Sequence, residues 1–119
     1  MQFQSYFYAA SGTGLDSFFS LPRFRCAQTV IDDAPAFAGI YGLFDGEELI
    51  YIGRATSDPG HTIRDQLLLH RAGNLGDCTR AATHYTFEIS RTARTREIEV
   101  LADHAARTNG TPRCNREAA

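Results

Sequence analysis

The sequence predicts an α/β fold in which helices pack on a small, mainly antiparallel sheet. Strand-like and helix-like segments alternate after residue 39, and 43% of the 119 residues are apolar, which is enough for one compact core. The segments before residue 39 show no clear periodicity. We therefore expect residues 1–38 to form an N-terminal extension packed on a domain of residues 39–119.

The clearest element is a hairpin over residues 39–53. Both of its arms, 39–44 and 48–53, are rich in β-branched and aromatic residues. Asp45-Gly46 lies between them, and this dipeptide is a strong signal for a tight hairpin turn.

The turn decides whether Tyr41 and Tyr51 lie on one face of the sheet. A two-residue loop at Asp45-Gly46 would place them on opposite faces, because side chains alternate along a strand. A three-residue loop, or a bulge at Gly46, shifts the register by one residue and places both on the same face.

The remaining elements follow from local signals. A helix is expected to start at Asp58-Pro59 or Thr62 and to stop at Gly73. After this helix we expect a strand at 84–89, a helix at 92–107 closed by Asn109-Gly110, and an extended tail at 111–115. Before the hairpin we expect strands at 2–8 and 27–31 and a helical turn at 15–21. The second helix has an expected apolar stripe of Ile98, Leu101, Ala102 and Ala105.

Charge is distributed unevenly along the chain. Residues 1–53 hold six carboxylates and two arginines, whereas residues 54–119 hold eight carboxylates and ten arginines. The net charge of −2 argues mildly against a strong nucleic-acid binder. Every basic side chain is arginine, whose planar fork suits phosphate oxygens. If the protein binds phosphates, the useful side chains are Arg54, Arg64, Arg71 and Arg113.

Other classes of protein are less favoured. No apolar run is long enough to span a bilayer, and the first residues lack the pattern of a signal peptide, so we expect a cytoplasmic protein. Cys26, Cys78 and Cys114 are widely spaced and odd in number, which favours free thiols over a disulfide framework. The cysteines and histidines lack paired zinc-ligand spacing.

A series of short motifs now becomes informative through its order. Gly39-Ile40-Tyr41 and Tyr51-Ile52-Gly53 lie on adjacent strands and are followed by Arg64, Glu97 and Asn115. This order resembles the signature of the GIY-YIG nuclease superfamily and covers residues 39–115. The resemblance implies a central three-stranded sheet and a divalent-metal-dependent endonuclease that hydrolyses phosphodiester bonds in DNA.

The resemblance also implies roles for individual side chains. Glu97 would bind the metal, Mg²⁺ or Mn²⁺, since hard cations prefer oxygen ligands. Tyr41 would act as the base, with Tyr51 as its hydrogen-bond partner. A nearby guanidinium and metal would lower the pKa of the phenol. Asn115 corresponds to the asparagine that closes the family pattern.

The arginines and His70 complete the implied site. Arg64 and Arg54 would neutralise charge on the scissile phosphate. His70 would contact phosphate or the leaving group, and a structural role at the end of the helix is the alternative.

Two features depart from the family pattern. Arg54 stands where the family often has lysine, and the interval from Glu97 to Asn115 is longer than usual. The longer interval leaves Glu99 as a competing metal ligand. Glu97 is preferred because Val100 and Leu101, three and four residues later, place it beside the packed face.

The alternative function is a catalytically inactive module of the same fold that binds nucleic acid or a protein partner. The net negative charge and the arginine at position 54 favour it. A protein with little basic surface would also need another subunit, either a partner protein or a second copy of the chain, to hold its DNA.

Overall fold

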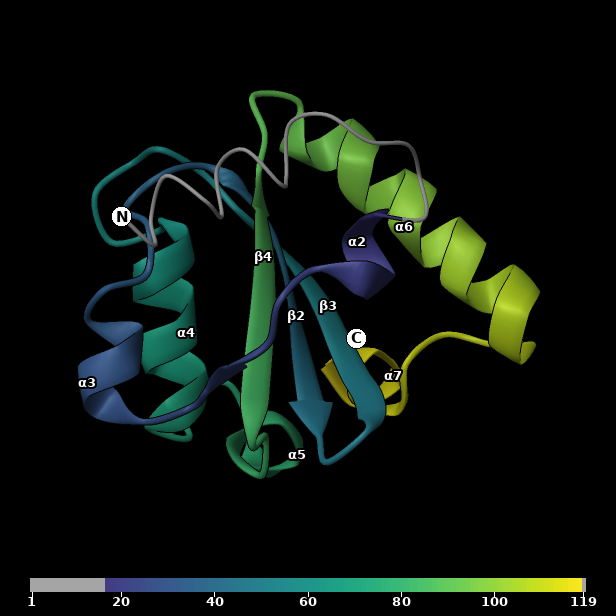
Figure 1. Ribbon diagram of the computed structural model, residues 1–119, viewed down its shortest axis with the longest axis horizontal. Helices are drawn as coiled ribbons and strands as arrows, with labels where there is room; N and C mark the ends of the chain where they lie inside the picture. The colour runs from purple at the N-terminus through teal and green to yellow at the C-terminus, as the bar shows by residue number, and fades with distance from the viewer. Residues whose placement is uncertain (1–16, 119) are drawn as a thin grey trace.

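The computed structural model describes residues 17–118, which form a four-stranded antiparallel sheet with helices on both faces (Figure 1). The strand order is β1-β4-β2-β3. The strands are β1 (Phe24–Arg25), β2 (Gly39–Asp45), β3 (Glu48–Ala55) and β4 (His84–Ile89). The expected α/β class is correct, but the expected three-stranded sheet is wrong, because β1 adds a fourth strand beside β4.

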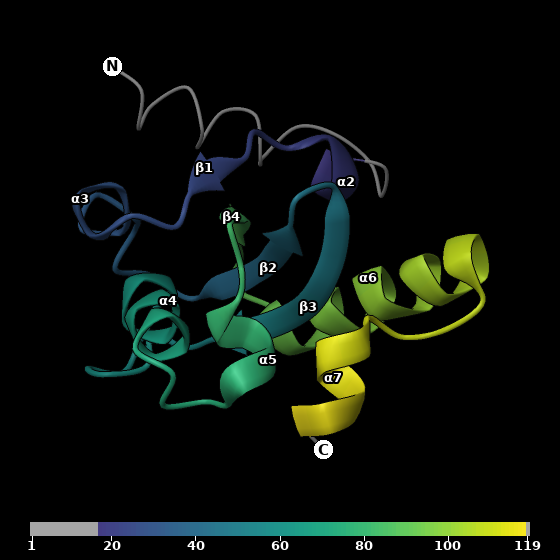
Figure 2. The ribbon, with the colours of Figure 1, turned by 90° about the horizontal axis from the view of Figure 1, so that it is seen from below.

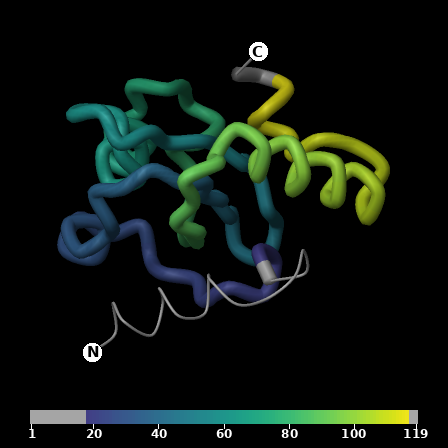
Figure 3. Tube along the Cα trace, turned by 90° about the horizontal axis from the view of Figure 1, so that it is seen from above, coloured from purple at the N-terminus to yellow at the C-terminus, as the bar shows by residue number. Residues whose placement is uncertain are grey.

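Six helices flank the sheet within residues 17–118. They are α2 (Ser17–Ser20), α3 (Gln28–Ile31), α4 (Ile63–Arg71), α5 (Asp77–Arg80), α6 (Ala93–Thr108) and α7 (Arg113–Ala118). Helices α3 and α4 cover one face of the sheet, and α2 and α6 cover the other (Figures 1 and 3). The sheet therefore separates two hydrophobic clusters.

Side chains of the hairpin alternate between these two clusters. Tyr41 and Leu43 face the cluster on the α4 side, together with Leu67. Ile40 and Ile52 face the cluster on the α6 side. This is the two-residue period that the sequence of the hairpin indicated.

Residues 17–38 are part of this packing. Phe18 and Leu21 are buried against the α6 side of the sheet. The strand expected at 27–31 is wrong, because residues 28–31 form α3 and the pairing segment is the preceding two-residue β1. The strand expected at 2–8 lies outside the described residues.

The two long helices begin and end near the expected residues. Thr62 caps α4 with a pair of hydrogen bonds. The backbone N–H of Asp65 donates to the Thr62 hydroxyl, and the backbone N–H of Thr62 donates to the Asp65 carboxylate. Helix α6 ends at Asn109, which has the left-handed conformation (φ 67°). The tail expected to be extended is wrong beyond Pro112, because residues 113–118 form α7.

The apolar stripe expected on α6 is wrong at Ile98 and Ala102, which are exposed, whereas Leu101 packs against the cluster on the α6 side. Ile98 is 59% exposed, whereas the buried residues of the helix are Ala93, Val100 and His104. The helix is rotated because Arg96 forms a two-point ion pair with Glu88 of β4, at 2.6 and 2.9 Å. An ion pair at a helix–sheet contact leaves no signal in apolar periodicity.

The expectation of three free thiols is also wrong. Cys78 and Cys114 form a disulfide, with their Cα atoms 5.6 Å apart, and Cys26 is free. Helices α5 and α7 lie side by side below the sheet, which brings the two cysteines together (Figure 2). No helix within residues 17–118 is long and apolar enough to cross a membrane.

Candidate active site

Tyr41 and Tyr51 lie on the same face of the hairpin. Leu43 pairs with Tyr51 and Phe44 with Leu49, so Ile50 is an extra residue in β3. This bulge shifts the register by one residue, and the two tyrosine rings lie 6.1 Å apart. The shared face agrees with the expectation from the motif order, but the extra residue lies within β3 rather than at the turn.

Gly53 makes room for the phenol of Tyr41. Tyr41 lies opposite Gly53 in the β2–β3 pairing. A Cβ atom at Gly53 would collide with the ring and hydroxyl of Tyr41 and with the ring of Tyr51. The glycine of the Tyr-Ile-Gly triplet is therefore required by close packing between the two tyrosines.

His70 holds the hydroxyl of Tyr41 in place. It lies in the last turn of α4, with Nε2 2.8 Å from the Tyr41 hydroxyl and Nδ1 2.7 Å from the hydroxyl of Thr79. Its ring is 4.9 Å from that of Tyr51. A neutral imidazole has one donor and one acceptor nitrogen, so Thr79, His70 and Tyr41 form one directional chain of hydrogen bonds.

The imidazole of His70 is neutral near pH 7. Its side chain is 3% exposed, and burial lowers its pKa to about 4. Burial penalises the charged form because the buried ring loses its water. His70 therefore cannot supply a positive charge for a phosphate.

The two tyrosines differ in access to water. Tyr41 is 1% exposed, and burial, with smaller effects of Tyr51 and Glu97, raises its pKa well above the usual value. Tyr51 is only partly buried; burial and the Glu97 carboxylate raise its pKa, and a hydrogen bond with Tyr41 lowers it. The side chains of this site therefore raise the pKa of Tyr41 rather than lower it.

Glu97 approaches the tyrosines from α6. Within one row across the sheet, Ile40 pairs with Arg54 on one side and with Glu88 on the other. Arg96 binds Glu88, and Glu97 lies 3.7 Å from the guanidinium of Arg54. Two consecutive residues thus fix the first turns of α6 to β4 and β3.

The environment of Glu97 differs from that of Glu99. The Glu97 side chain is 22% exposed, and burial raises its pKa while Arg54 lowers it. The Glu99 side chain is 48% exposed and pairs with Arg96. Val100 is buried, and Leu101 packs against the same cluster, which agrees with the reason for preferring Glu97.

Arg64 lies apart from this cluster. It is in the first turn of α4, about 9 Å along the helix axis from His70. Its Nε donates to the carbonyl of Ala34 at 2.8 Å. Within residues 17–118 it makes no hydrogen bond or ion pair with the tyrosines, His70 or Glu97.

Asn115 binds the outer edge of the sheet. Its Oδ1 accepts from the backbone N–H of Ile52, and its Nδ2 donates to the carbonyl of the same residue, both at 2.9 Å. Strand β3 is an edge strand, and its outward backbone groups need partners. Asn115 therefore holds the segment between Tyr51 and Gly53.

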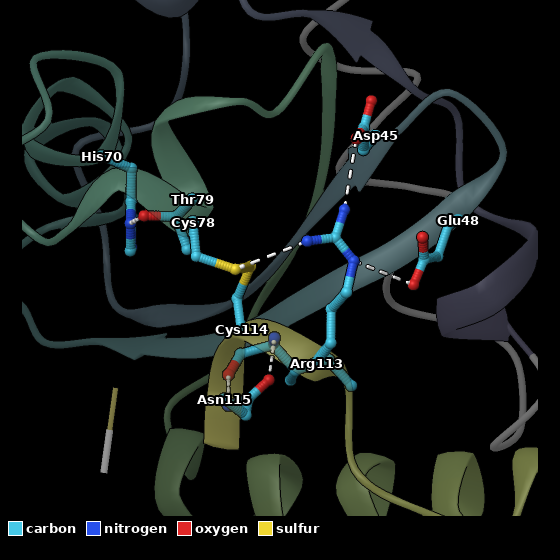
Figure 4. Close-up of a disulfide and its surroundings, with 9 residues drawn as sticks. Asp45, Glu48, His70, Cys78, Thr79, Arg113, Cys114 and Asn115 are labelled. Carbon is cyan, nitrogen blue, oxygen red and sulfur yellow. Dashed lines mark hydrogen bonds and ion pairs between the residues drawn. A yellow bond between two sulfur atoms is a disulfide. The ribbon is translucent and has the colours of Figure 1, made fainter. Parts of the chain in front are cut away.

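Each cysteine of the disulfide is followed in sequence by a residue that positions part of the site. Cys78 precedes Thr79, which binds His70, and Cys114 precedes Asn115, which binds β3 (Figure 4). Sequence analysis missed Thr79 and both cysteines. Only the spatial contact of α5 with α7 identifies them, since the motif order selects Asn115 in α7 but neither cysteine nor Thr79.

Arg113 is already paired with carboxylates. It binds Asp45 and Glu48 at the turn end of the hairpin, each at 3.2 Å (Figure 4). Its use as a phosphate ligand would require breaking these contacts, so it is a weaker candidate than its sequence position indicated.

Comparison with known proteins identifies no relative: no family model, curated protein or solved structure matches this chain.

The buried His70 predicts a specific pH dependence of stability. Its pKa is about 4 in the folded protein and about 6.5 when unfolded, so its contribution is complete above pH 6.5 and is lost as pH falls toward 4. The loss should reach roughly 2 kcal/mol near pH 4.5. Urea unfolding of wild type and His70→Gln at pH 7 and 4.5 isolates this effect. The exposed His61→Gln variant should behave like wild type; equal pH dependence in all three would contradict a neutral His70.

Proposed function

We propose that this protein is a divalent-metal-dependent endonuclease of GIY-YIG type that hydrolyses phosphodiester bonds in DNA. One observation carries the proposal: Tyr41, Tyr51 and His70 come from three different elements and contact one another, and the charge of Glu97 on α6 raises the pKa of both tyrosines. These are residues that the motif order selected before any geometry was considered. Unrelated surface residues have no reason to converge in this way.

The proposal assigns one Mg²⁺ or Mn²⁺ ion to the carboxylate of Glu97. Within residues 17–118, no three histidine, cysteine or acidic side chains converge, so the site offers the single carboxylate of Glu97 beside phenolic oxygens. Magnesium keeps several waters and is often held by one carboxylate and substrate phosphate. A bound ion would polarise the phosphate and neutralise developing charge.

The geometry favours Tyr51, rather than Tyr41, as the group that meets the attacking water. Tyr51 is partly exposed, whereas Tyr41 is buried behind it and bonded to His70. In the proposed mechanism the water oxygen attacks phosphorus and the leaving P–O bond breaks. Tyr51, in its phenolate form, accepts the water proton, and the leaving oxygen takes a proton from solvent. Tyr41 and His70 fix the position of Tyr51.

The arginines have unequal roles in this proposal. The Arg54 side chain is 42% exposed beside Glu97, so a phosphate could reach it. The two terminal nitrogens of Arg64 form no hydrogen bond or ion pair with the described residues, and they would bind phosphate away from the reacting group. One planar guanidinium group can donate two parallel hydrogen bonds to the oxygens of a phosphate.

The direct test is cleavage of supercoiled, branched and single-stranded DNA with Mg²⁺, with EDTA as control. Metal-dependent nicking or cutting of any of these supports the proposal. The alternative is an inactive module that binds nucleic acid or a protein. Arg54 and Arg113 are both paired with carboxylates, which favours this alternative. DNA binding by fluorescence anisotropy without cleavage would establish it.

The tyrosine assignment predicts a difference in pH profile. Because the Tyr51 pKa is raised, its phenolate is scarce near neutral pH, and the cleavage rate should rise with pH between about 7 and about 9. Tyr51→Phe should lower the rate roughly tenfold or more and flatten this rise. Tyr41→Phe should keep the rise. A flat profile in Tyr41→Phe only would show that Tyr41 is the base.

A further inference from the structure

A small pocket lies on the α4 side of the sheet, behind the candidate active site. It has a volume of about 330 Å³, and its walls come from β2, α4, α5 and the segment after β1. Leu43 and Leu67 form apolar walls, and His70 separates the pocket from the hydroxyl of Tyr41. Its volume is at the small end of the range for ligand sites.

Two arginines at this pocket lack a carboxylate partner. Arg71, from the end of α4, and Arg80, from the end of α5, both line it. Within residues 17–118, neither forms an ion pair, whereas Arg23, Arg54, Arg96 and Arg113 all do. Among the residues that the structure describes, no acidic one lines the pocket.

A hydrogen bond holds the side chain of Arg71, and the side chain of Arg80 lies close to Gly73. Nε of Arg71 donates to the carbonyl of Cys26 at 3.1 Å, and its two terminal nitrogens form no hydrogen bond within residues 17–118. The side chain of Arg80 lies over Gly73, where a Cβ atom would be 3.0 Å from its Cδ. Two guanidinium groups at one small pocket supply up to four terminal N–H₂ groups.

The other polar groups do not compete for a ligand. Thr79 and His70 are bonded to each other, and His70 is bonded to Tyr41. The pocket is therefore positive, partly apolar and small. We propose that it binds a phosphate group between Arg71 and Arg80. Guanidinium forks match the geometry of phosphate, and apolar walls strengthen the attraction by lowering the local dielectric.

The phosphate has two conceivable sources, inorganic phosphate and the phosphate of a nucleotide. Both share the tetrahedral oxyanion that the arginines would recognise, and the proposal does not depend on nuclease activity. Titration with inorganic phosphate and with AMP distinguishes them, because a site built for the nucleotide binds AMP more tightly.

Cys26 is a built-in reporter of occupancy. It is the free cysteine, lines the pocket, and is partly buried; burial raises its pKa to about 11, against a lowering effect of Arg71. An anion bound beside it would block reagents and oppose formation of the thiolate. Alkylation by iodoacetamide at this single thiol therefore measures binding.

The experiment is alkylation of Cys26 in the oxidised full chain at constant ionic strength, followed by mass spectrometry. Saturating phosphate should slow alkylation on the order of threefold or more relative to chloride. Arg71→Ala/Arg80→Ala should abolish the protection. Arg91→Ala/Arg94→Ala, which removes two exposed arginines outside the pocket, should retain it.

Each variant is compared with and without phosphate, because loss of Arg71 alone changes thiol reactivity. Arg80→Gln, which leaves Arg71 in place, should weaken protection without disturbing Cys26. Equal protection by phosphate and chloride, or protection that survives in Arg71→Ala/Arg80→Ala, would overturn the proposal.

Discussion

Glu97→Ala is expected to lower the rate of Mg²⁺-dependent DNA cleavage by roughly 100- to 1,000-fold, while the protein stays folded. Glu97 is the single carboxylate whose charge reaches both Tyr41 and Tyr51. Its removal takes away the group proposed to hold the metal. The fold should survive because its contact with Arg54 is long, at 3.7 Å, and partly exposed. Gel-based cleavage kinetics and circular dichroism measure the two effects.

Glu99→Ala is the matched control. Glu99 lies on the same helix, two residues away, but is exposed and contacts Arg96 rather than the tyrosines. Its loss should change the cleavage rate less than threefold or so, as expected for an exposed surface pair. Full activity in Glu97→Ala with loss in Glu99→Ala would show that the metal ligand has been assigned to the wrong carboxylate.

Arg54→Ala separates charge stabilisation from metal binding. Its loss removes the cation beside Glu97 and should therefore leave metal affinity intact or increased. If Arg54 binds phosphate, cleavage falls although the metal still binds. Metal titration of the cleavage rate distinguishes this variant from Glu97→Ala, whose defect should lessen at high metal concentration.

The sequence predicts those parts of the fold that depend on local chemistry. The hairpin, the capping of α4 by Thr62 and the end of α6 at Asn109 all rest on residues within a few positions of the element. Strand β4 was recognised because its six residues alternate and lie between clear breaks. In each case the signal is short-range, so one sequence is enough to find it.

Features that depend on tertiary contact were missed. Strand β1 has two residues and exists because β4 offers an open edge. The bulge at Ile50 responds to packing on the α4 side, since both Ile50 and Tyr51 face that cluster. The orientation of α6 depends on the Arg96–Glu88 ion pair. None of these leaves a periodic pattern along the chain.

The candidate site shows the same division. Motif order identified the tyrosines and His70, which contact one another, and Glu97, whose charge raises the pKa of both tyrosines. It could not reveal that Tyr41 is buried and Tyr51 only partly so, because tertiary pairing makes β2 a central strand and β3 an edge strand. It also could not reveal Thr79, which reaches His70 only because α5 folds under α4.

Loss of the disulfide is expected to have the largest effect on stability. Cys78 and Cys114 are separated by 36 residues, and closing a loop of this length stabilises a fold by about 3 to 4 kcal/mol. Cys78→Ser/Cys114→Ser should lower the melting temperature on the order of 10 to 20 °C. Differential scanning fluorimetry of oxidised wild type, wild type with dithiothreitol and the double variant measures the effect.

Cys26→Ser is the control, because it removes the free thiol and keeps the disulfide. Its melting temperature should stay close to that of wild type and should fall on reduction, whereas the double variant should not respond to dithiothreitol. Thiol counting after denaturation gives an independent check: the oxidised chain should show one reactive thiol. Three thiols in protein purified without reductant would contradict the disulfide.

The disulfide should also affect the candidate site, because it lies between the residues that position it. Thr79 follows Cys78 and Asn115 follows Cys114, so release of α5 and α7 loosens both the His70–Tyr41 chain and the edge contact at Ile52. Cleavage by the double variant, measured well below its melting temperature, should therefore fall while its helix content is retained. Asn115→Ala tests one side of this coupling alone. Unchanged cleavage in both variants would show that the disulfide stabilises the fold without positioning the site.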